Sequence, residues 1–273
     1  MNLPTDPFLL GVNYWPRRKA MYWWGDFDAQ EVREEFAIIR DLGMNLVRIF
    51  LLWDDWQPAP DLVNATALDN LGTVLDIAAG MGLKLDITFF TGHMSGPNWS
   101  PGWMLLPGQP MPPEVRQLVS GGRVVDCGYR NPYTDPMTIS AAELLLRQVV
   151  GRYKDHPAVG FWNLGNEPDL FAWPPDAATG REWVRRMTGL IRSLDPIHPV
   201  TCGLHMDSVV RDNGLRLHDV FGEVDFAVMH SYPMYTPWAK GPLDVEFVPF
   251  TCALTSALTG KLTLMEEFGG CTN

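Results

Sequence analysis

Short apolar runs alternate along the chain with longer stretches in which apolar residues recur at helical spacing. The apolar runs predict strands over 8–14, 45–51, 83–90, 159–163, 200–204, 224–230 and 261–266. The helical spacing predicts helices over 28–42, 67–79, 138–153 and 177–194. Because each strand is almost wholly apolar and helices separate most of them, we expect a parallel sheet covered on both faces.

Polar residues gather where these strands end, which decides between two parallel architectures. No glycine-rich nucleotide loop follows the first strand, as a doubly wound sheet would usually require. A barrel instead concentrates polar side chains at the carboxyl ends of many strands. The sequence therefore predicts an α/β fold, a (β/α)8 TIM barrel, as a single domain over 1–273. A long loop rich in glycine and proline is inserted at about 91–137. About seven strands are present, so we expect the barrel to be incomplete at its C-terminal end.

Composition and charge exclude several classes of protein. The chain has 273 residues, of which 46% are hydrophobic and 19% charged, so it is not a disordered chain. The formal net charge of −11 disfavours nucleic acid as a partner. No apolar run is long enough to cross a membrane, so no membrane partner is expected.

The four cysteines are far apart and suggest neither a zinc site nor a disulfide framework. We therefore expect no metal, and no cofactor is indicated. The first residues lack a basic segment followed by an apolar one. This predicts a cytoplasmic protein, or a secreted one if a leader has been removed.

One carboxylate, Glu167, ends the predicted strand 159–163 in the segment Phe-Trp-Asn-Leu-Gly-Asn-Glu-Pro (161–168). An apolar strand that stops at an amide, a carboxylate and a proline places polar groups at the rim of a barrel. The alternative is a surface turn in which Glu167 caps the following segment.

A second pair of carboxylates, Glu266 and Glu267, ends the last predicted strand. Side chains alternate along a strand, so the two should point in opposite directions. Leu262 and Leu264 share a face with Glu266, and Thr263 shares one with Glu267. We therefore expect Glu267 inside the barrel and Glu266 outside, beside a basic or loop partner.

Two carboxylates that face each other across a cleft are what glycoside hydrolysis requires. The acid must be neutral and the nucleophile ionised, so the surroundings of the two must differ. Arg48, which we place at the end of the second strand, could supply the cation beside Glu267. The alternative for Arg48 is a purely structural ion pair inside the barrel.

These motifs together resemble glycoside hydrolase clan A, and most closely family 5, the cellulase and β-mannanase family. Asn166-Glu167-Pro168 follows the fourth strand, Glu267-Phe268-Gly269 the seventh, Arg48 the second and His230-Ser231-Tyr232 the sixth. The segment 10–15 resembles first strands in family 5 and in clan A β-galactosidases. The resemblance extends over about 8–270, and the chain stops before the eighth strand at which family members usually carry an aromatic residue.

The resemblance implies a retaining double displacement on β-linked glucose- or mannose-type oligo- or polysaccharides, with no cofactor. In it, Glu167 matches the acid/base and Glu267 the nucleophile. The substrate-binding residues implied by the resemblance, or by aromatic side chains in loops that can stack on sugars, are Arg48, His93, Asn166, His230, Tyr232, Trp15 and Trp53.

The same motifs also fit other functions. The chain could be a β-galactosidase-like enzyme of the same clan. It could also be a catalytically silent carbohydrate-binding barrel, or an incomplete subunit completed by a second chain or a missing C-terminal segment. A phosphate-handling barrel is disfavoured because two adjacent glutamates would repel the ligand.

Overall fold

Seven parallel strands form the central layer of the chain, whose residues 7–270 are described by a computed structural model. The five strands β1 (Gly11–Asn13), β2 (Leu46–Leu52), β3 (Lys84–Thr91), β9 (Val159–Asn166) and β10 (Val200–Gly203) pair in that order. β11 (Ala227–Ser231) pairs with β12 (Thr263–Phe268). An isolated parallel bridge between His205 and His230 joins the two groups. The predicted parallel barrel architecture is confirmed.

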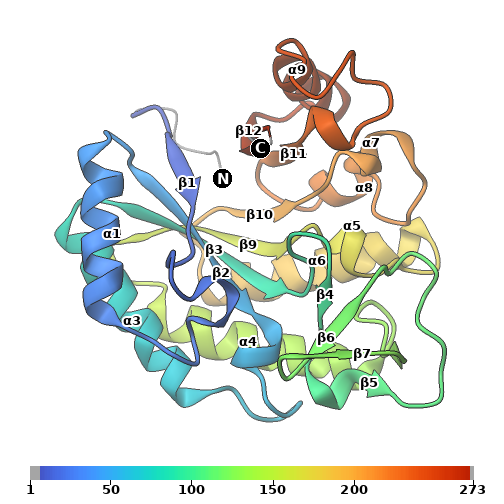
Figure 1. Ribbon diagram of the computed structural model, residues 1–273, viewed down its shortest axis with the longest axis horizontal. Coiled ribbons are helices and arrows are strands. Elements are labelled where there is room, and N and C mark those ends of the chain that lie inside the picture. The colour runs from blue at the N-terminus through green and yellow to red at the C-terminus, as the bar shows by residue number, and fades with distance from the viewer. Residues whose placement is uncertain (1–6, 271–273) are drawn as a thin grey trace.

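The helices between the strands pack on the outside of the sheet (Figure 1). The longer ones are α1 (Ala29–Asp41), α3 (Ala65–Gly80), α4 (Pro136–Tyr153), α6 (Ala177–Leu194) and α9 (Phe247–Thr259). Asp28, Asn64, Asp135 and Asp176 cap the first four of these by accepting hydrogen bonds from backbone N–H groups of the first turn. Each of these four helices thus starts where a short polar side chain satisfies its free donors.

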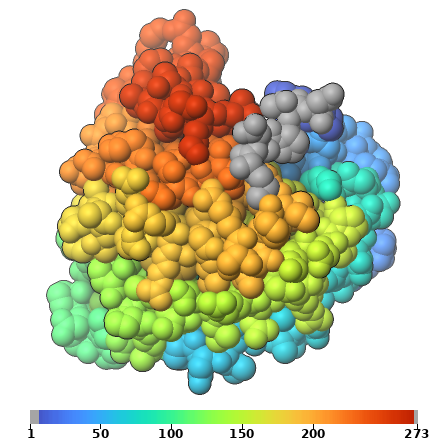
Figure 2. Space-filling view, turned by 180° about the vertical axis from the view of Figure 1, so that it is seen from behind, coloured from blue at the N-terminus to red at the C-terminus, as the bar shows by residue number. Residues whose placement is uncertain are grey.

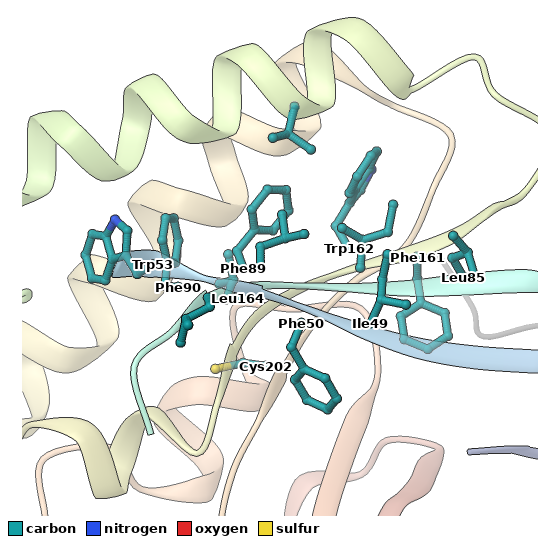
Figure 3. Packing of buried hydrophobic residues seen from close by; sticks show 14 of the residues in the cluster. Ile49, Phe50, Trp53, Leu85, Phe89, Phe90, Phe161, Trp162, Leu164 and Cys202 are labelled. Atoms are coloured by element: carbon teal, nitrogen blue, oxygen red, sulfur yellow. The ribbon is translucent and has the colours of Figure 1, made fainter. Parts of the chain in front are cut away.

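The core lies between the sheet and this helical layer. Every residue of β2 is buried, as expected for a strand covered on both faces. In Figure 3, Phe89 and Trp162 point toward the helices, whereas Phe50 points to the other side of the sheet. The indole N–H of Trp162 donates to Asp195, which satisfies its one polar group inside the core.

The stretch between β3 and α4, predicted as an irregular loop, contains short strands. β4 (Asn98–Trp99), β6 (Leu118–Ser120) and β7 (Arg123–Val125) form one small sheet, and β5 (Leu105–Leu106) pairs with β8 (Gly128–Tyr129). Leu118, Met104 and Tyr129 are buried beneath this stretch. Strands of two or three residues are too short to show an alternating pattern among glycines and prolines, so the sequence did not predict them.

Several shorter helices and α9 were not predicted either. The short ones are α2 (Trp53–Trp56), α5 (Pro168–Phe171), α7 (Asp207–Val210) and α8 (Leu217–Phe221). α9 is rich in threonine and aromatic residues, which have weak helical propensity, and packs against β11 and β12. Tertiary packing therefore decides its conformation.

Among the described residues, β1 pairs only with β2 and β12 only with β11. Apolar side chains are exposed near these two edges: Phe8, Leu10 and Val12 on one side, and Leu258, Leu262 and Phe268 on the other. In the view from behind, the C-terminal part and the N-terminal part lie on opposite sides of the upper surface (Figure 2). That a further segment or chain completes the barrel stays a prediction.

No helix in the described part of the chain is both long enough and apolar enough to span a membrane.

Candidate active site

The polar residues predicted at the strand ends converge inside the barrel. Glu167 directly follows β9, His230 lies in β11, and Glu267 lies in β12. The predicted position of Arg48 at the end of the second strand is wrong. β2 continues to Leu52, so Arg48 lies within the strand. Its long side chain nevertheless crosses the barrel interior to reach β12, where it meets Glu267.

Glu267 is held by two donors, one in β2 and one directly after β11. Arg48 Nη1 lies 2.5 Å from Glu267 Oε1, and the Tyr232 hydroxyl donates to Glu267 Oε2 at 2.9 Å. The Glu267 side chain is 8% exposed, so these bonds form in a largely dry environment. A charge-assisted hydrogen bond is strong in such surroundings and fixes the orientation of the carboxylate.

The Arg48 side chain is itself held in place by Thr88 and Phe50. Its Nε donates to the Thr88 hydroxyl at 2.9 Å, and the guanidinium lies 4.6 Å from the centre of the Phe50 ring. Trp15 also stacks on the Phe50 ring, with 4.6 Å between the ring centres and 15° between the planes. Trp15 is half-buried, and this stacked contact supports the Phe50–Arg48 pair.

Glu167 has an unusual backbone conformation for a residue that is not glycine. Its φ of 47° and ψ of 54° lie in the left-handed region. Strain of this kind persists where the surroundings over-determine the geometry. Here it turns the chain from β9 into α5 while the carboxylate enters the barrel, where Oε1 lies 3.1 Å from His230 Nδ1.

The carboxylates of Glu167 and Glu267 approach each other closely. One oxygen of each and a ring nitrogen of His230 all lie within 4.8 Å of one another. A metal ion could accept such a spacing, but the cationic side chain of Arg48 already occupies one side of Glu267. The three groups form an ion-pair cluster with Arg48.

His93 and Asn166 lie on the other side of Glu167. His93 Nε2 is 3.6 Å from Glu167 Oε2, and its Nδ1 is 2.7 Å from Asn98 Oδ1. Asn166 donates through Nδ2 to the His93 carbonyl at 2.9 Å. Its Oδ1 is buried, and no group of residues 7–270 donates to it. The structure thus brings together Glu167, Glu267, Arg48, His93, Asn166, His230 and Tyr232.

Glu266 overturns the prediction that it points out of the barrel. Its side chain is 3% exposed, and its Oε2 lies 2.8 Å from His230 Nε2 and 3.1 Å from Arg48 Nη2. The pairing of β11 with β12 shifts by one residue between Met229 and His230. This irregularity breaks strict alternation, so both neighbouring glutamates reach the same two cations.

Trp53 is a third correction. Its side chain is 1% exposed, and its indole N–H donates to Gln57. The ring packs 5.1 Å from Phe90 and 6.1 Å from Trp103. Trp53 therefore belongs to the core, as an aromatic side chain with a satisfied polar group does, and has no free face for a sugar.

Sequence reasoning missed Asp86 and Asn163, which also reach this cluster. Asp86 Oδ2 lies 3.5 Å from Arg48 Nε, and Asn163 Nδ2 donates to Glu266 at 2.8 Å. A usable signal existed: Asp86 and Thr88 alternate with apolar residues in β3, which marks one face of that strand as polar.

The charges of the cluster shift several pKa values. Burial disfavours the ionised form of Glu167, but the hydrogen bond and charge of His230 outweigh it and lower the pKa to about 2. Burial likewise opposes ionisation of Glu266, and the charge of Arg48 and the bond to His230 lower its pKa to about 2. Asp86 differs, because burial and the nearby charge of Glu266 raise its pKa well above the usual range.

Comparison with known proteins identifies the family. The model of glycoside hydrolase family 42, described as β-galactosidase, matches residues 21–179. The chain belongs to this family. The predicted membership of clan A, with its likeness to the mannanases, is also confirmed by the relatives and structures that follow.

A β-galactosidase from Arthrobacter sp. is 26% identical over 196 residues, which cover 67% of this chain and 26% of the relative. A mannan endo-1,4-β-mannosidase from Aspergillus clavatus is 33% identical over 149 residues, which cover 50% of this chain and 34% of the relative. Among solved structures, an exo-β-1,4-mannosidase from Opitutaceae bacterium strain TAV5 has a TM-score of 0.80 and 28% identity.

That solved structure covers 96% of this chain, whereas the chain covers 45% of it. The chain therefore spans about a quarter to a half of the length of these relatives.

Proposed function

We propose that this chain carries the active site of a retaining β-glycoside hydrolase. Glu267 is the nucleophile and Glu167 the acid/base in this proposal. The observation that supports it is the separation of the two carboxylates, whose nearest oxygens lie within 4.8 Å. Retaining enzymes hold their carboxyl groups about 5–5.5 Å apart, whereas inverting enzymes need roughly 6.5–9.5 Å to admit a water.

The geometry supports a distinct role for each group. In the first step Glu267 attacks the anomeric carbon, the bond to the leaving oxygen breaks, and Glu167 gives that oxygen a proton. In the second step Glu167 takes a proton from water, which attacks the same carbon and releases Glu267. Arg48 and Tyr232 hold Glu267 in a fixed orientation, which preorganises the attack.

The buried Oδ1 of Asn166, which has no donor within 7–270, supports binding of a sugar hydroxyl beside Glu167. A buried acceptor without a partner costs free energy that a ligand hydroxyl would recover. We propose a β-linked mannose- or glucose-type saccharide as substrate, and the names of the mannosidase relatives favour mannose. β-Galactosides are the second candidate, because the matching family model is described as β-galactosidase.

The test is covalent trapping with 2-deoxy-2-fluoro β-mannosyl, β-glucosyl and β-galactosyl fluorides, read by intact mass and peptide mapping. We expect one adduct, on Glu267, with the fastest reagent indicating the sugar. Glu267→Gln should remain unlabelled while keeping the fold, which serves as the control. An adduct on Glu266 would reassign the nucleophile.

The silent-barrel alternative gives a different result in the same experiment. A carbohydrate-binding barrel without catalysis would form no adduct with any reagent, yet calorimetry would detect sugar binding that Glu167→Gln leaves unchanged. That pair of outcomes would overturn the proposed hydrolysis.

A further inference from the structure

Glu266 is a buried carboxylate that the proposed reaction does not use. It reaches the middle of the barrel, where it accepts from Asn163 of β9 and contacts Arg48 of β2 and His230 of β11. Burying an ionised carboxylate costs several kcal/mol unless partners compensate it. A barrel interior is ordinarily filled by branched apolar side chains, so a third glutamate in this position calls for a role.

The surroundings of Glu266 are shaped to admit it. A Cβ atom at Gly203 of β10 would lie 2.9 Å from Glu266 Oε2, 3.0 Å from Arg48 Nη2 and 2.7 Å from the Gly165 carbonyl. Only glycine leaves space for the carboxylate and the guanidinium at this point. Asn163 is held in turn, because its Oδ1 accepts from the backbone N–H groups of Gly165 and Gly203.

The contact of Glu266 with His230 determines how that ring is oriented. His230 is fully buried; its Nε2 lies 2.8 Å from Glu266, and its Nδ1 lies 3.1 Å from Glu167. A carboxylate on one ring nitrogen fixes the proton there and sets the role of the other nitrogen. With the Nε2 proton directed at Glu266, Nδ1 is the nitrogen that exchanges a proton with Glu167.

We propose that Glu266 is a positioning residue: it holds the Nε2 proton of His230 and so makes Nδ1 the proton partner of Glu167. This inference rests on the proposed function, in which Glu167 is the acid/base. Before the leaving oxygen departs, the Nδ1 proton moves to Glu167, which then gives it to that oxygen. In the second step, Glu167 takes a proton from water and returns it to Nδ1, so the protons balance over the cycle.

The charges that face His230 are consistent with this arrangement. They come from Glu167 after β9, Arg48 of β2, and Glu266 and Glu267 of β12. Burial would lower the pKa of His230, but the three carboxylates outweigh burial and Arg48 and raise it to about 10. His205, which follows β10, joins His230 through a backbone bridge.

The test replaces one charge in the cluster with Glu266→Gln, which keeps the shape and a carbonyl acceptor. The matched control is Asp195→Asn, another buried carboxylate bonded to a histidine, His198, outside the site. Nitrogen-15 NMR of the imidazoles across pH reports the protonation of His230. The pH profile of kcat/KM, with the best sugar from the trapping experiment, reports the reaction.

We expect the His230 ring to keep both of its protons beyond pH 8, in the wild type and in the Asp195→Asn variant alike. Glu266→Gln should lower the pH at which His230 loses a proton by at least about one unit, because a carboxylate in hydrogen-bond contact is lost. The basic limb of kcat/KM should move by the same amount. An unchanged His230 titration and an unchanged basic limb would overturn the proposal.

The proposal can be tested even if the variant does not fold or the protein shows no turnover. If Glu266→Gln does not fold, the wild-type spectrum decides: a His230 Nε2 without a proton at pH 7 overturns the proposal. The NMR readout needs no turnover. A normal NMR shift without any fluorosugar adduct would therefore refute the proposed hydrolysis and leave the hold of Glu266 on His230 intact.

Discussion

The two facing carboxylates of the site have opposite kinds of partner. Glu267 meets Arg48 and Tyr232, whereas Glu167 meets the imidazoles of His230 and His93. A guanidinium keeps its charge over the whole accessible pH range, whereas an imidazole can release a proton to a neighbouring group and take it back. The permanence of the neighbouring charge therefore gives two similar side chains different chemistry, as the proposed nucleophile and acid/base require.

Removal of the permanent cation should have the largest effect. Arg48→Met leaves Glu267 and Glu266 buried without their shared partner, so we expect a loss of about 3–5 kcal/mol in the free energy of unfolding. We also expect turnover to be lost. Urea denaturation monitored by tryptophan fluorescence measures the first effect.

The control for that experiment is Arg181→Met, because the half-exposed Arg181 side chain pairs with Glu223 on the surface. An exposed pair contributes about 0–1 kcal/mol, so this variant should stay close to wild type. Equal losses in the two variants would show that the buried position of Arg48 confers no special stabilisation.

A second prediction concerns the titratable side of the comparison. The pKa of Glu167 is lowered from 4.5 to about 2, so its ionisation stabilises the fold above pH 4.5. That stabilisation is lost as the pH falls from about 4.5 through about 2. The difference in unfolding free energy between wild type and Glu167→Gln should therefore grow from pH 2 to 4.5 and then level off.

Asp169 acts in the opposite direction, because burial raises its pKa to about 6 and its ionisation therefore destabilises the fold. Both proteins keep Asp169, so the difference between them isolates the contribution of Glu167. Urea titrations at half-unit pH steps provide the measurement. A difference that stays flat between pH 2 and 4.5 would contradict the prediction and show that the histidines do not hold Glu167 ionised.

The smallest expected effect comes from loss of the second donor to Glu267. Tyr232→Phe removes one hydrogen bond to Glu267 and leaves Arg48 in place. A hydrogen bond to a charged group contributes about 1.5–3 kcal/mol, so kcat/KM should fall by about 10- to 100-fold. Tyr235→Phe, at a nearby and largely exposed position, should be unchanged. A loss in both variants would indicate a general disturbance of this segment.

Much of the architecture followed from local pattern. The helix predicted over 177–194 is α6 with the same bounds, and the main parallel strands lie where the apolar runs placed them, within a few residues at their ends. Glu167 and Glu267 were also recognised, because each is a carboxylate that abruptly ends an apolar strand. Periodicity and strand ends are written in neighbouring residues, so a single sequence reveals them.

What lay beyond the pattern depends on neighbours distant in the chain. Glu266 points inward because β12 shifts its register against β11, and alternation along one strand cannot show that shift. Trp53 is buried because Phe90 and Trp103 close over it. The sequence by itself determined the strands, the helices and the two facing carboxylates. Only the tertiary structure decided which charges meet, because register and burial are properties of paired strands and not of one segment.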